Sequence, residues 1–167
     1  MDLTYRLGGD VYAQSDKSAY DIGSNGVNSG MGAVYLNDYF NRVFNSDFLV
    51  NLHRTFNSDW KGSLILGQNY YSNVYSVRST QALTLTLPDF LDASNATTSV
   101  AGEGEAKKRT SAWYGQGELD YKNMLYLTLT GRDETSSTLP AANNNFFYPS
   151  AGVSFIFTEP MGLSGSP

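Results

Sequence analysis

Between Ser111 and Phe157, apolar and polar side chains alternate along three consecutive runs of the chain. Residues 113–121 place Trp, Gly, Gly, Leu and Tyr at odd positions and Tyr, Gln, Glu and Asp at even positions. Residues 124–130 resume the pattern with Leu against Tyr and Thr, and residues 147–157 repeat it with Phe, Ala and Val against Tyr, Ser and Gly. Successive strand side chains point to opposite faces, so the pattern predicts three strands that each have one apolar face and one polar face.

The short connection Lys122-Asn123 predicts that the first two of these runs form an antiparallel hairpin. A period of two then fixes which side chains share a face of the sheet. The apolar face is expected to hold Leu125, Leu127, Leu129, Val153, Phe155 and Phe157. The opposite, polar face is expected to hold Tyr126, Thr128, Thr130 and Ser154.

The rest of the chain continues this all-β pattern. We predict an antiparallel meander of six main strands, near residues 3–12, 41–56, 63–80, 109–121, 124–132 and 147–157. The long connections 13–32, 81–108 and 132–145 are rich in Ser, Asn, Asp and Gly, which are typical of loops, although Gly30–Leu36 and Leu83–Leu87 could form short extra strands. The short connections are Asn57–Gly62 and Lys122-Asn123. Long and short connections therefore alternate, as in outer-membrane barrels, and each kind is expected to gather at one end.

The same region carries a family resemblance. Several short motifs occur in an order that resembles the SusC/RagA class of TonB-dependent outer-membrane receptors, within the part of that family that forms its large barrel. The motifs are Gly117–Thr128, Gly131-Arg132, Ser136–Pro140, Asn144–Ser150 and Ser154–Thr158, together with Gly67-Gln-Asn and the turn Asn57–Trp60 further upstream.

The resemblance implies a segment of a transmembrane β-barrel wall in the bacterial cell outer membrane, surrounded by outer-membrane lipid. It also implies a receptor that imports oligosaccharides or peptides, takes energy from TonB and works with a SusD-like surface lipoprotein. The plug domain, TonB-binding segment and further strands of that family are not recognisable in this sequence. We therefore expect residues 1–163 to be a partial barrel without catalysis of its own, and residues 164–167 to be a flexible tail.

The amino terminus is consistent with such a piece. Met1 leads directly into alternating residues and no signal peptide opens the chain, so we interpret the sequence as an internal segment of an exported protein. The sequence contains no run of about 18 apolar residues, so it predicts no transmembrane helix.

A soluble β-sandwich or small barrel that binds carbohydrate is the alternative. It is supported by the Tyr and Asn content and by a mean hydropathy of −0.33. Membrane barrels are also polar on average, because half of each strand faces a wet interior, so hydropathy does not decide between the two. The two alternatives differ in what covers the face that carries Leu125, Leu127 and Phe155. Lipid covers this face in a membrane barrel, whereas a second sheet covers it in a soluble sandwich.

Four side chains near a long loop are the candidate ligand contacts. Asn69, Tyr71, Asn73 and Tyr75 occupy alternate positions of one expected strand. Tyrosine rings stack on sugars, and neighbouring amides can hydrogen-bond a ligand. An aromatic girdle at the membrane interface is the competing interpretation of the tyrosines.

No pattern in the sequence predicts an enzyme, a cofactor or a metal site. His53 is the only histidine, and there is no cysteine, so a histidine-pair metal site and thiolate chemistry are excluded. The carboxylate pairs Glu118/Asp120 and Glu103/Glu105 could in principle serve a glycosidase, but polar lining and solvated loop charge are the simpler interpretations. The net charge of −5 argues against a nucleic-acid partner.

Overall fold

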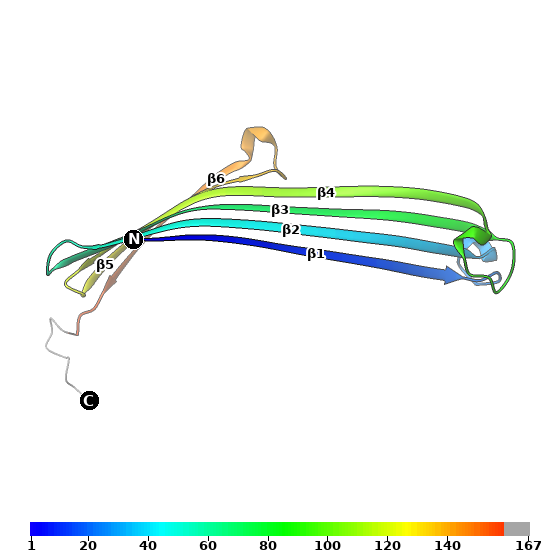
Figure 1. Ribbon diagram of the computed structural model, residues 1–167, viewed down its shortest axis with the longest axis horizontal. Coiled ribbons are helices and arrows are strands. Elements are labelled where there is room, and N and C mark those ends of the chain that lie inside the picture. The colour runs from blue at the N-terminus through cyan, green and yellow to red at the C-terminus, as the bar shows by residue number, and fades with distance from the viewer. Residues whose placement is uncertain (159–167) are drawn as a thin grey trace, which may run out of the picture. The chain divides into compact units, whose positions relative to one another are not determined.

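The computed structural model describes residues 1–158 and contains six β-strands (Figure 1). The strands are β1 (Asp2–Tyr20), β2 (Ala33–Thr55), β3 (Trp60–Leu85), β4 (Ala96–Tyr121), β5 (Leu125–Ser136) and β6 (Asn145–Phe155). The helical elements of this part of the chain are short 3-10 turns within the loops, η1 (Asn28–Gly30), η2 (Ala93–Asn95) and η3 (Ala141–Asn143). The expected tail 164–167 lies outside the described residues.

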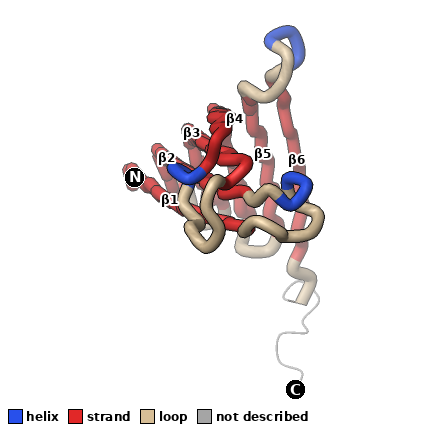
Figure 2. Tube along the Cα trace, turned by 90° about the vertical axis from the view of Figure 1, so that its right-hand side faces the viewer, coloured by secondary structure: helices blue, strands red, loops and turns tan. Residues whose placement is uncertain are grey.

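All six strands belong to one sheet in the order β1-β2-β3-β4-β5-β6. β5 pairs antiparallel with both β4 and β6, and Figure 2 shows how the loops and their 3-10 turns join the strands. The predicted all-β antiparallel meander is therefore confirmed.

The register of the last three strands confirms the predicted faces. Leu125 is opposite Phe155, and Leu127 is opposite Val153. On the other face, Tyr126 is opposite Ser154. Directly paired residues of an antiparallel ladder project to the same side, so the apolar and polar sets separate as expected. The exception is Phe157, which lies beyond the end of β6 at Phe155 and is not part of the ladder.

The chain divides into two compact units, and the first holds both short connections. It comprises Met1–Gly8, Phe44–Ser72 and, of the described residues, 108–158. Within it, the side-chain nitrogen of Lys61 lies 2.6 Å from the Oδ1 atom of Asn123. The turn between β2 and β3 therefore contacts the turn between β4 and β5, which confirms that the short connections share one end.

The second unit comprises Gly9–Val43 and Asn73–Lys107 and holds two of the long connections. A small core of Val34, Ala82 and Leu85 lies beneath them. The Leu85 amide donates to the Met31 carbonyl at 2.9 Å, so these two loops lie together as predicted. The third long connection belongs to the first unit, where the Ser137 amide donates to the carbonyl of Arg109 at 2.9 Å.

The strands of the second unit are longer than the sequence predicts. β1 continues to Tyr20 and β4 already begins at Ala96, within segments expected to be loops. The short strands expected at Gly30–Leu36 and Leu83–Leu87 are instead the start of β2 and the end of β3. In β4, residues 97–109 are exposed on both faces. This segment is rich in Ser, Gly, Glu and Lys and has no apolar face, so its sequence resembles that of a loop. It forms a strand because its backbone pairs with the neighbouring strands.

Candidate functional site: the two faces of the sheet

One face of the first unit is apolar and exposed. It includes Leu119 opposite Leu127 and, on the next strand, Val153 opposite Leu127. Trp113 is 68% exposed and Val153 is 71% exposed. A contiguous apolar surface of this kind marks a site that another apolar surface or a membrane covers.

A shallow groove runs across this face. Its volume is about 460 Å³, and leucine and phenylalanine side chains form most of its wall. The glycines at its floor explain the depression, because a Cβ added at Gly117 would meet nothing within 4 Å. The apolar lining consists of Leu52, Phe56, Leu64, Leu119, Leu127 and Leu129.

An aromatic and cationic cluster lies at the end of the face where the short turns meet. The rings of Trp60 and Tyr121 are 4.7 Å apart between centroids. The Lys122 ammonium lies 5.3 Å from the centre of the Tyr121 ring and 3.8 Å from the Asp59 carboxylate. Aromatic rings with adjacent lysines are typical of the interface belt of a membrane protein, because the ring body is apolar while its edge and the charge stay wet.

The opposite face of the same unit is polar and carries Tyr114 of β4. A Cβ added to Gly67 would overlap the ring of Tyr114, so this ring lies directly over the backbone of β3. The guanidinium carbon of Arg132, which is opposite Tyr114 in the ladder, lies 5.7 Å from the centre of the same ring. Arg132 also forms an ion pair of 2.6 Å with Glu134. Tyr114, Arg132 and Glu134 therefore hold one another in a fixed arrangement.

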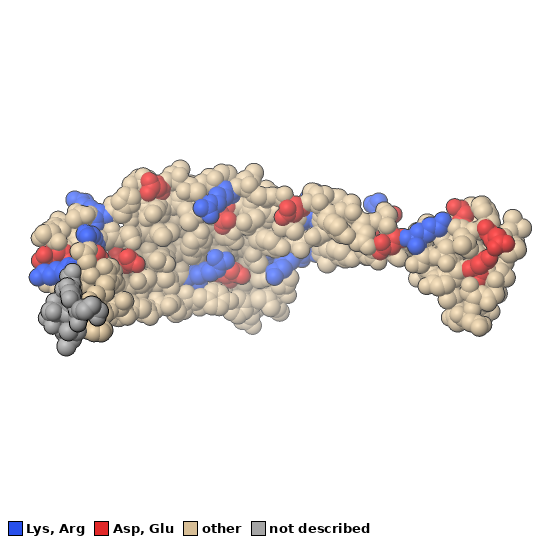
Figure 3. All heavy atoms as spheres, turned by 90° about the horizontal axis from the view of Figure 1, so that it is seen from below, with Lys and Arg blue, Asp and Glu red and all other residues tan. Residues whose placement is uncertain are grey.

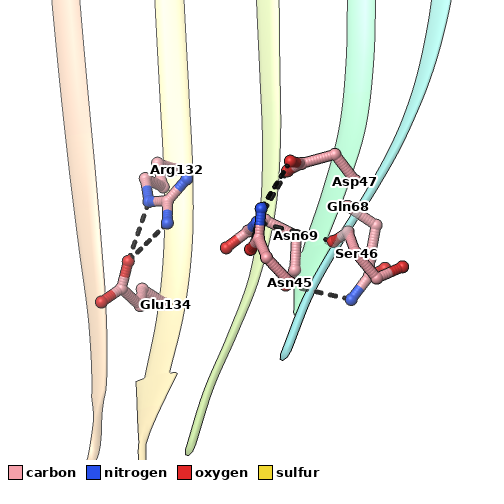
Figure 4. A network of polar contacts seen from close by, with 7 residues as sticks. All are labelled: Asn45, Ser46, Asp47, Gln68, Asn69, Arg132 and Glu134. Carbon is pink, nitrogen blue, oxygen red and sulfur yellow. Dashed lines mark hydrogen bonds and ion pairs between the residues drawn. The ribbon is translucent and has the colours of Figure 1, made fainter. Parts of the chain in front are cut away.

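The second part of the polar face is an amide and carboxylate network that holds Asn69 (Figure 4). The Asn69 side-chain amide donates to Asp47 Oδ1 at 2.6 Å and to Asn45 Oδ1 at 3.0 Å. Asn45 in turn donates to Asp47 Oδ2 at 3.0 Å. The network leaves carboxylate and amide groups on a half-buried surface, where they can also accept hydrogen bonds from a bound molecule.

The four predicted ligand-facing residues occur in two different environments. Asn69 and Tyr71 belong to the first unit, and Asn73 and Tyr75 belong to the second. Tyr75 stacks on Tyr39, with centroids 6.4 Å apart and planes inclined by 24°. The Oδ1 atom of Asn73 is buried without a hydrogen-bond partner. Their role as ligand contacts stays a prediction.

The hydrogen-bond partners of Asn69 and the cluster around Tyr114 were not predicted from the sequence. Asn45 and Asp47 alternate on β2 as Asn69 and Tyr71 do on β3, so period two places them on the polar face of their strand. Nothing in the sequence shows which residues on neighbouring strands meet, because this depends on the register. The contact of Tyr114 with Gly67 is a consequence of that register.

The remaining candidates for chemistry are ordinary surface groups. His53 and Asp2 are both exposed, and the Nδ1 atom of His53 lies 3.9 Å from the Oδ2 atom of Asp2. Glu105 forms a half-exposed ion pair with Lys107 at 2.6 Å. Within residues 1–158 no three His, Cys, Asp or Glu side chains are grouped so as to hold a metal ion, and no helix is long and apolar enough to span a membrane. On the face drawn in Figure 3, charged side chains are scattered among uncharged ones.

Comparison with known proteins identifies solved structures that share this fold. No family model matches the sequence, and no curated protein matches it. Solved structures do match the fold: the RagAB peptide transporter with a TM-score of 0.88 and 13% identity, and the RagAB peptide importer in the open-open state with a TM-score of 0.84 and 14% identity. Each match covers 98% of this chain, which spans about a fifth of the length of the matched chains, 19% and 18% respectively. At this identity, the likeness shows that the chain has the fold of a part of these transporters.

Proposed function

We propose that this chain is a wall segment of an outer-membrane β-barrel receptor that imports peptides or oligosaccharides. One observation carries the proposal: one face of the sheet has a band of apolar side chains that extends along each strand for about as many residues as a bilayer-spanning strand needs. The band covers positions 113–121 of β4, from Trp113 to Tyr121, and positions 60–70 of β3, from Trp60 to Tyr70. A strand that crosses a bilayer at a tilt needs about 9–11 residues, which these ranges match.

The polar face is assigned to the interior of the barrel. Barrel strands alternate apolar side chains toward lipid with polar side chains toward the lumen. Along β4, the lumen-facing set includes Tyr114, Gln116 and Glu118, which are opposite Arg132, Thr130 and Thr128 of β5. This segment contributes hydrogen-bonding groups to the lining of the channel and no catalytic group.

The substrate and partner assignments follow the likeness to peptide importers. The resemblance of the sequence motifs to the SusC/RagA class supports two further proposals: a surface lipoprotein of the SusD type as the partner of the full receptor, and TonB as its energy source. The amide and carboxylate groups around Asn69 can accept hydrogen bonds from peptide N–H groups or from sugar hydroxyls. Peptide is favoured because the matched transporters are named for it, with oligosaccharide as the second substrate class.

A soluble sandwich that binds carbohydrate is the alternative function. It requires a second sheet to cover the apolar face, whereas the strands of residues 1–158 form a single sheet. On the apolar face of this sheet, the side chains of Leu129, Val153 and Phe155 are more than half exposed. The lipid-facing interpretation accounts for that exposure without an additional partner.

The two tryptophans of the chain provide the test. Trp60 and Trp113 lie near the two ends of the apolar band, so in a membrane both rings belong at an interface. The chain is refolded from denaturant with phosphatidylcholine vesicles whose acyl chains carry bromine either near the headgroup or deep in the bilayer. We expect quenching of tryptophan emission by both lipids, and stronger quenching by the shallow bromines.

Single-tryptophan variants separate the two positions. Trp60→Phe reports on Trp113, and Trp113→Phe reports on Trp60, and each is expected to show the same preference for shallow bromines. Emission that brominated vesicles leave unchanged, from a chain that stays dispersed without lipid, would overturn the membrane assignment and favour the soluble module.

A further inference from the structure

The apolar groove of the first unit reaches the end of the face where the short turns meet. Phe56, in its wall, directly precedes the turn between β2 and β3, and its amide donates to the Trp60 carbonyl at 2.9 Å. Gly62, which also lines the groove, follows Trp60 by two positions of β3 and therefore lies on the same face. The groove thus begins beside the Trp60 and Tyr121 rings, at the level that the proposed function assigns to a membrane interface.

Two glycines shape the groove in different ways. A Cβ added at Gly117 would meet nothing within 4 Å, and the φ angle of Gly117 is not positive, so neither crowding nor backbone conformation requires glycine there. A Cβ added at Gly62 would lie 3.0 Å from the ring of Phe56 and 3.4 Å from the side chain of Leu119. Gly62 therefore lets these two side chains approach the backbone of β3, whereas Gly117 leaves open space on a face whose other side chains are apolar.

Arg54 places a positive charge at the edge of this groove. It follows Leu52 and precedes Phe56 at alternate positions, so it projects to the same face as these two groove residues. Arg54 is exposed, and within residues 1–158 its guanidinium forms no hydrogen bond or ion pair. The lysines of this end differ, because Lys61 and Lys122 each have a polar side-chain partner.

The position of Arg54 along β2 sets its depth in a membrane. The strand ends at Thr55, so the guanidinium lies at the headgroup level and the groove extends from it toward the middle of the apolar band. Long cationic side chains at this level keep their apolar stem on the hydrocarbon and their charge among the headgroups. A guanidinium also presents a planar fork of donors that matches a phosphate group.

A hydrocarbon groove that ends at an unpaired guanidinium matches a molecule with the same two parts. The lipid-facing surface of another barrel offers apolar side chains and no anion, so it does not match Arg54. An anionic phospholipid offers both an acyl chain and a phosphate. A choline headgroup would bring a second cation close to the guanidinium, which weakens the attraction for phosphatidylcholine.

We infer that the groove and Arg54 form a binding site for a single anionic glycerophospholipid. One acyl chain lies in the groove over Gly117, and the phosphate is held by the Arg54 guanidinium. The inference rests on the proposed function, because it requires the apolar face to lie in a bilayer. It goes beyond that function, because an ordinary lipid shell does not distinguish one phospholipid from another.

Selective quenching of Trp60 tests the site, since Trp60 lies beside the groove. The Trp113→Phe chain is refolded with phosphatidylcholine vesicles that contain a minor fraction of brominated phosphatidylglycerol or, separately, the same fraction of brominated phosphatidylcholine with identical chains. We expect the brominated phosphatidylglycerol to quench Trp60 several-fold more. In the Trp60→Phe chain, Trp113 at the other end of the band should be quenched equally by the two lipids. The net charge of −5 gives the chain no general attraction for an anionic lipid, so enrichment requires a local cation.

Two pairs of variants in the Trp113→Phe chain separate the site from its surroundings. Arg54→Gln should abolish the preference for phosphatidylglycerol, whereas Lys61→Gln removes the same charge from the polar face of the same end and should keep it. Gly117→Leu fills the groove and should also abolish the preference. Ala151→Leu is its matched control, because Ala151 flanks Leu129 from β6 as Gly117 flanks it from β4, and Ala151 does not line the groove. Quenching by brominated phosphatidylcholine shows for each variant that the chain has inserted.

The outcomes distinguish failure of this site from failure of the proposed function. Equal quenching of Trp60 by the two lipids would show an ordinary lipid shell and overturn the site, while the membrane assignment stands. A preference that persists in Arg54→Gln or in Gly117→Leu, or that is as strong at Trp113, would overturn the site as well. If neither lipid quenches either tryptophan, the proposed function fails and the inference fails with it.

Discussion

The amide of Lys122 donates a hydrogen bond of 2.7 Å to the carbonyl of Asp59 and so joins the turns of two successive hairpins. Lys122 and Asn123 have positive φ angles of 57° and 54°, as the two central residues of a type I′ turn do. The contact connects residues 63 positions apart in sequence (122 − 59), so it forms only when the strands have the correct register. It therefore reports on the correct assembly of the sheet.

Lys122→Pro removes the donor and cannot adopt a positive φ. We expect it to lower the free energy of unfolding in detergent micelles by about 1–3 kcal/mol, since the Asp59 carbonyl loses its partner and the turn is distorted. Urea unfolding followed by tryptophan fluorescence measures the change. Lys122→Asn keeps the N–H group and tolerates the same φ, so it should stay within about 0.5 kcal/mol of the natural chain. Equal losses from both variants would contradict the role of the hydrogen bond.

Gly67→Ala tests the close contact between β3 and Tyr114. The added methyl group overlaps the tyrosine ring, which also has the Arg132 guanidinium 5.7 Å from its centre. We expect a loss of about 1–3 kcal/mol, the usual cost of overpacking. Gly117→Ala is the matched control, because nothing lies within 4 Å of the added atom.

The variants Gly67→Ala and Tyr114→Ala, together with the double variant, form a double-mutant cycle that measures the coupling between these two residues. With the ring absent, the added methyl group should cost little, which gives a coupling energy of about 0.5–3 kcal/mol. Strictly additive effects would show that the ring and the glycine do not act on each other.

The sequence predicted the parts of this fold that depend on local alternation. Leu125, Leu127 and Val153 are assigned to one face by period two alone, and the structure confirms the assignment. The extent of β4 could not be predicted in the same way, because residues 97–109 carry no apolar face and are held by their neighbours in the ladder. The hydrogen-bond partners of Asn69 depend on the register between β2 and β3, which could not be predicted from the single sequence.

Arginine substitutions along β5 test which face meets lipid, and at what depth. Leu129 is opposite Gly117, midway between Trp113 and Tyr121, so Leu129→Arg places a charge near the middle of the apolar band. We expect it to destabilise the membrane-inserted chain by about 2–4 kcal/mol, and Leu125→Arg, near the interface, by about 0–1 kcal/mol. Thr128→Arg, on the polar face, should be close to neutral. The fraction that floats with vesicles after refolding measures all three, and equal tolerance at positions 128 and 129 would contradict the assignment of faces.

Asp92 makes the loop between β3 and β4, residues 86–95, sensitive to acid. The hydrogen bond from the Ser94 hydroxyl, together with the Ser94 amide, holds the pKa of the Asp92 carboxyl below its ordinary value of 3.8. Because the folded-state pKa is lowered, the stabilisation is fully present above pH 3.8 and is lost as the pH falls through the folded-state pKa. After correction for intrinsic rates, the exchange of the Ser94 amide with deuterium should therefore become faster as the pH falls through the folded-state pKa of Asp92. Asp92→Asn should remove this additional pH dependence, and a natural chain that behaves like the variant would refute the assignment.

The last prediction concerns the edges of the sheet. β1 and β6 are the outer strands of the six, and each has a paired neighbour on one side only within the described residues. A membrane barrel of known type has at least about eight strands, so six do not close into one. The unpaired backbone of the outer strands favours addition of further strands, and the apolar face favours association in water. We expect the isolated chain in detergent-free buffer to form assemblies of several copies, measured by multi-angle light scattering. Detergent micelles should reduce their size by covering the apolar face. A compact monomer that stays dispersed without detergent would rule out both the open sheet and the barrel-wall assignment.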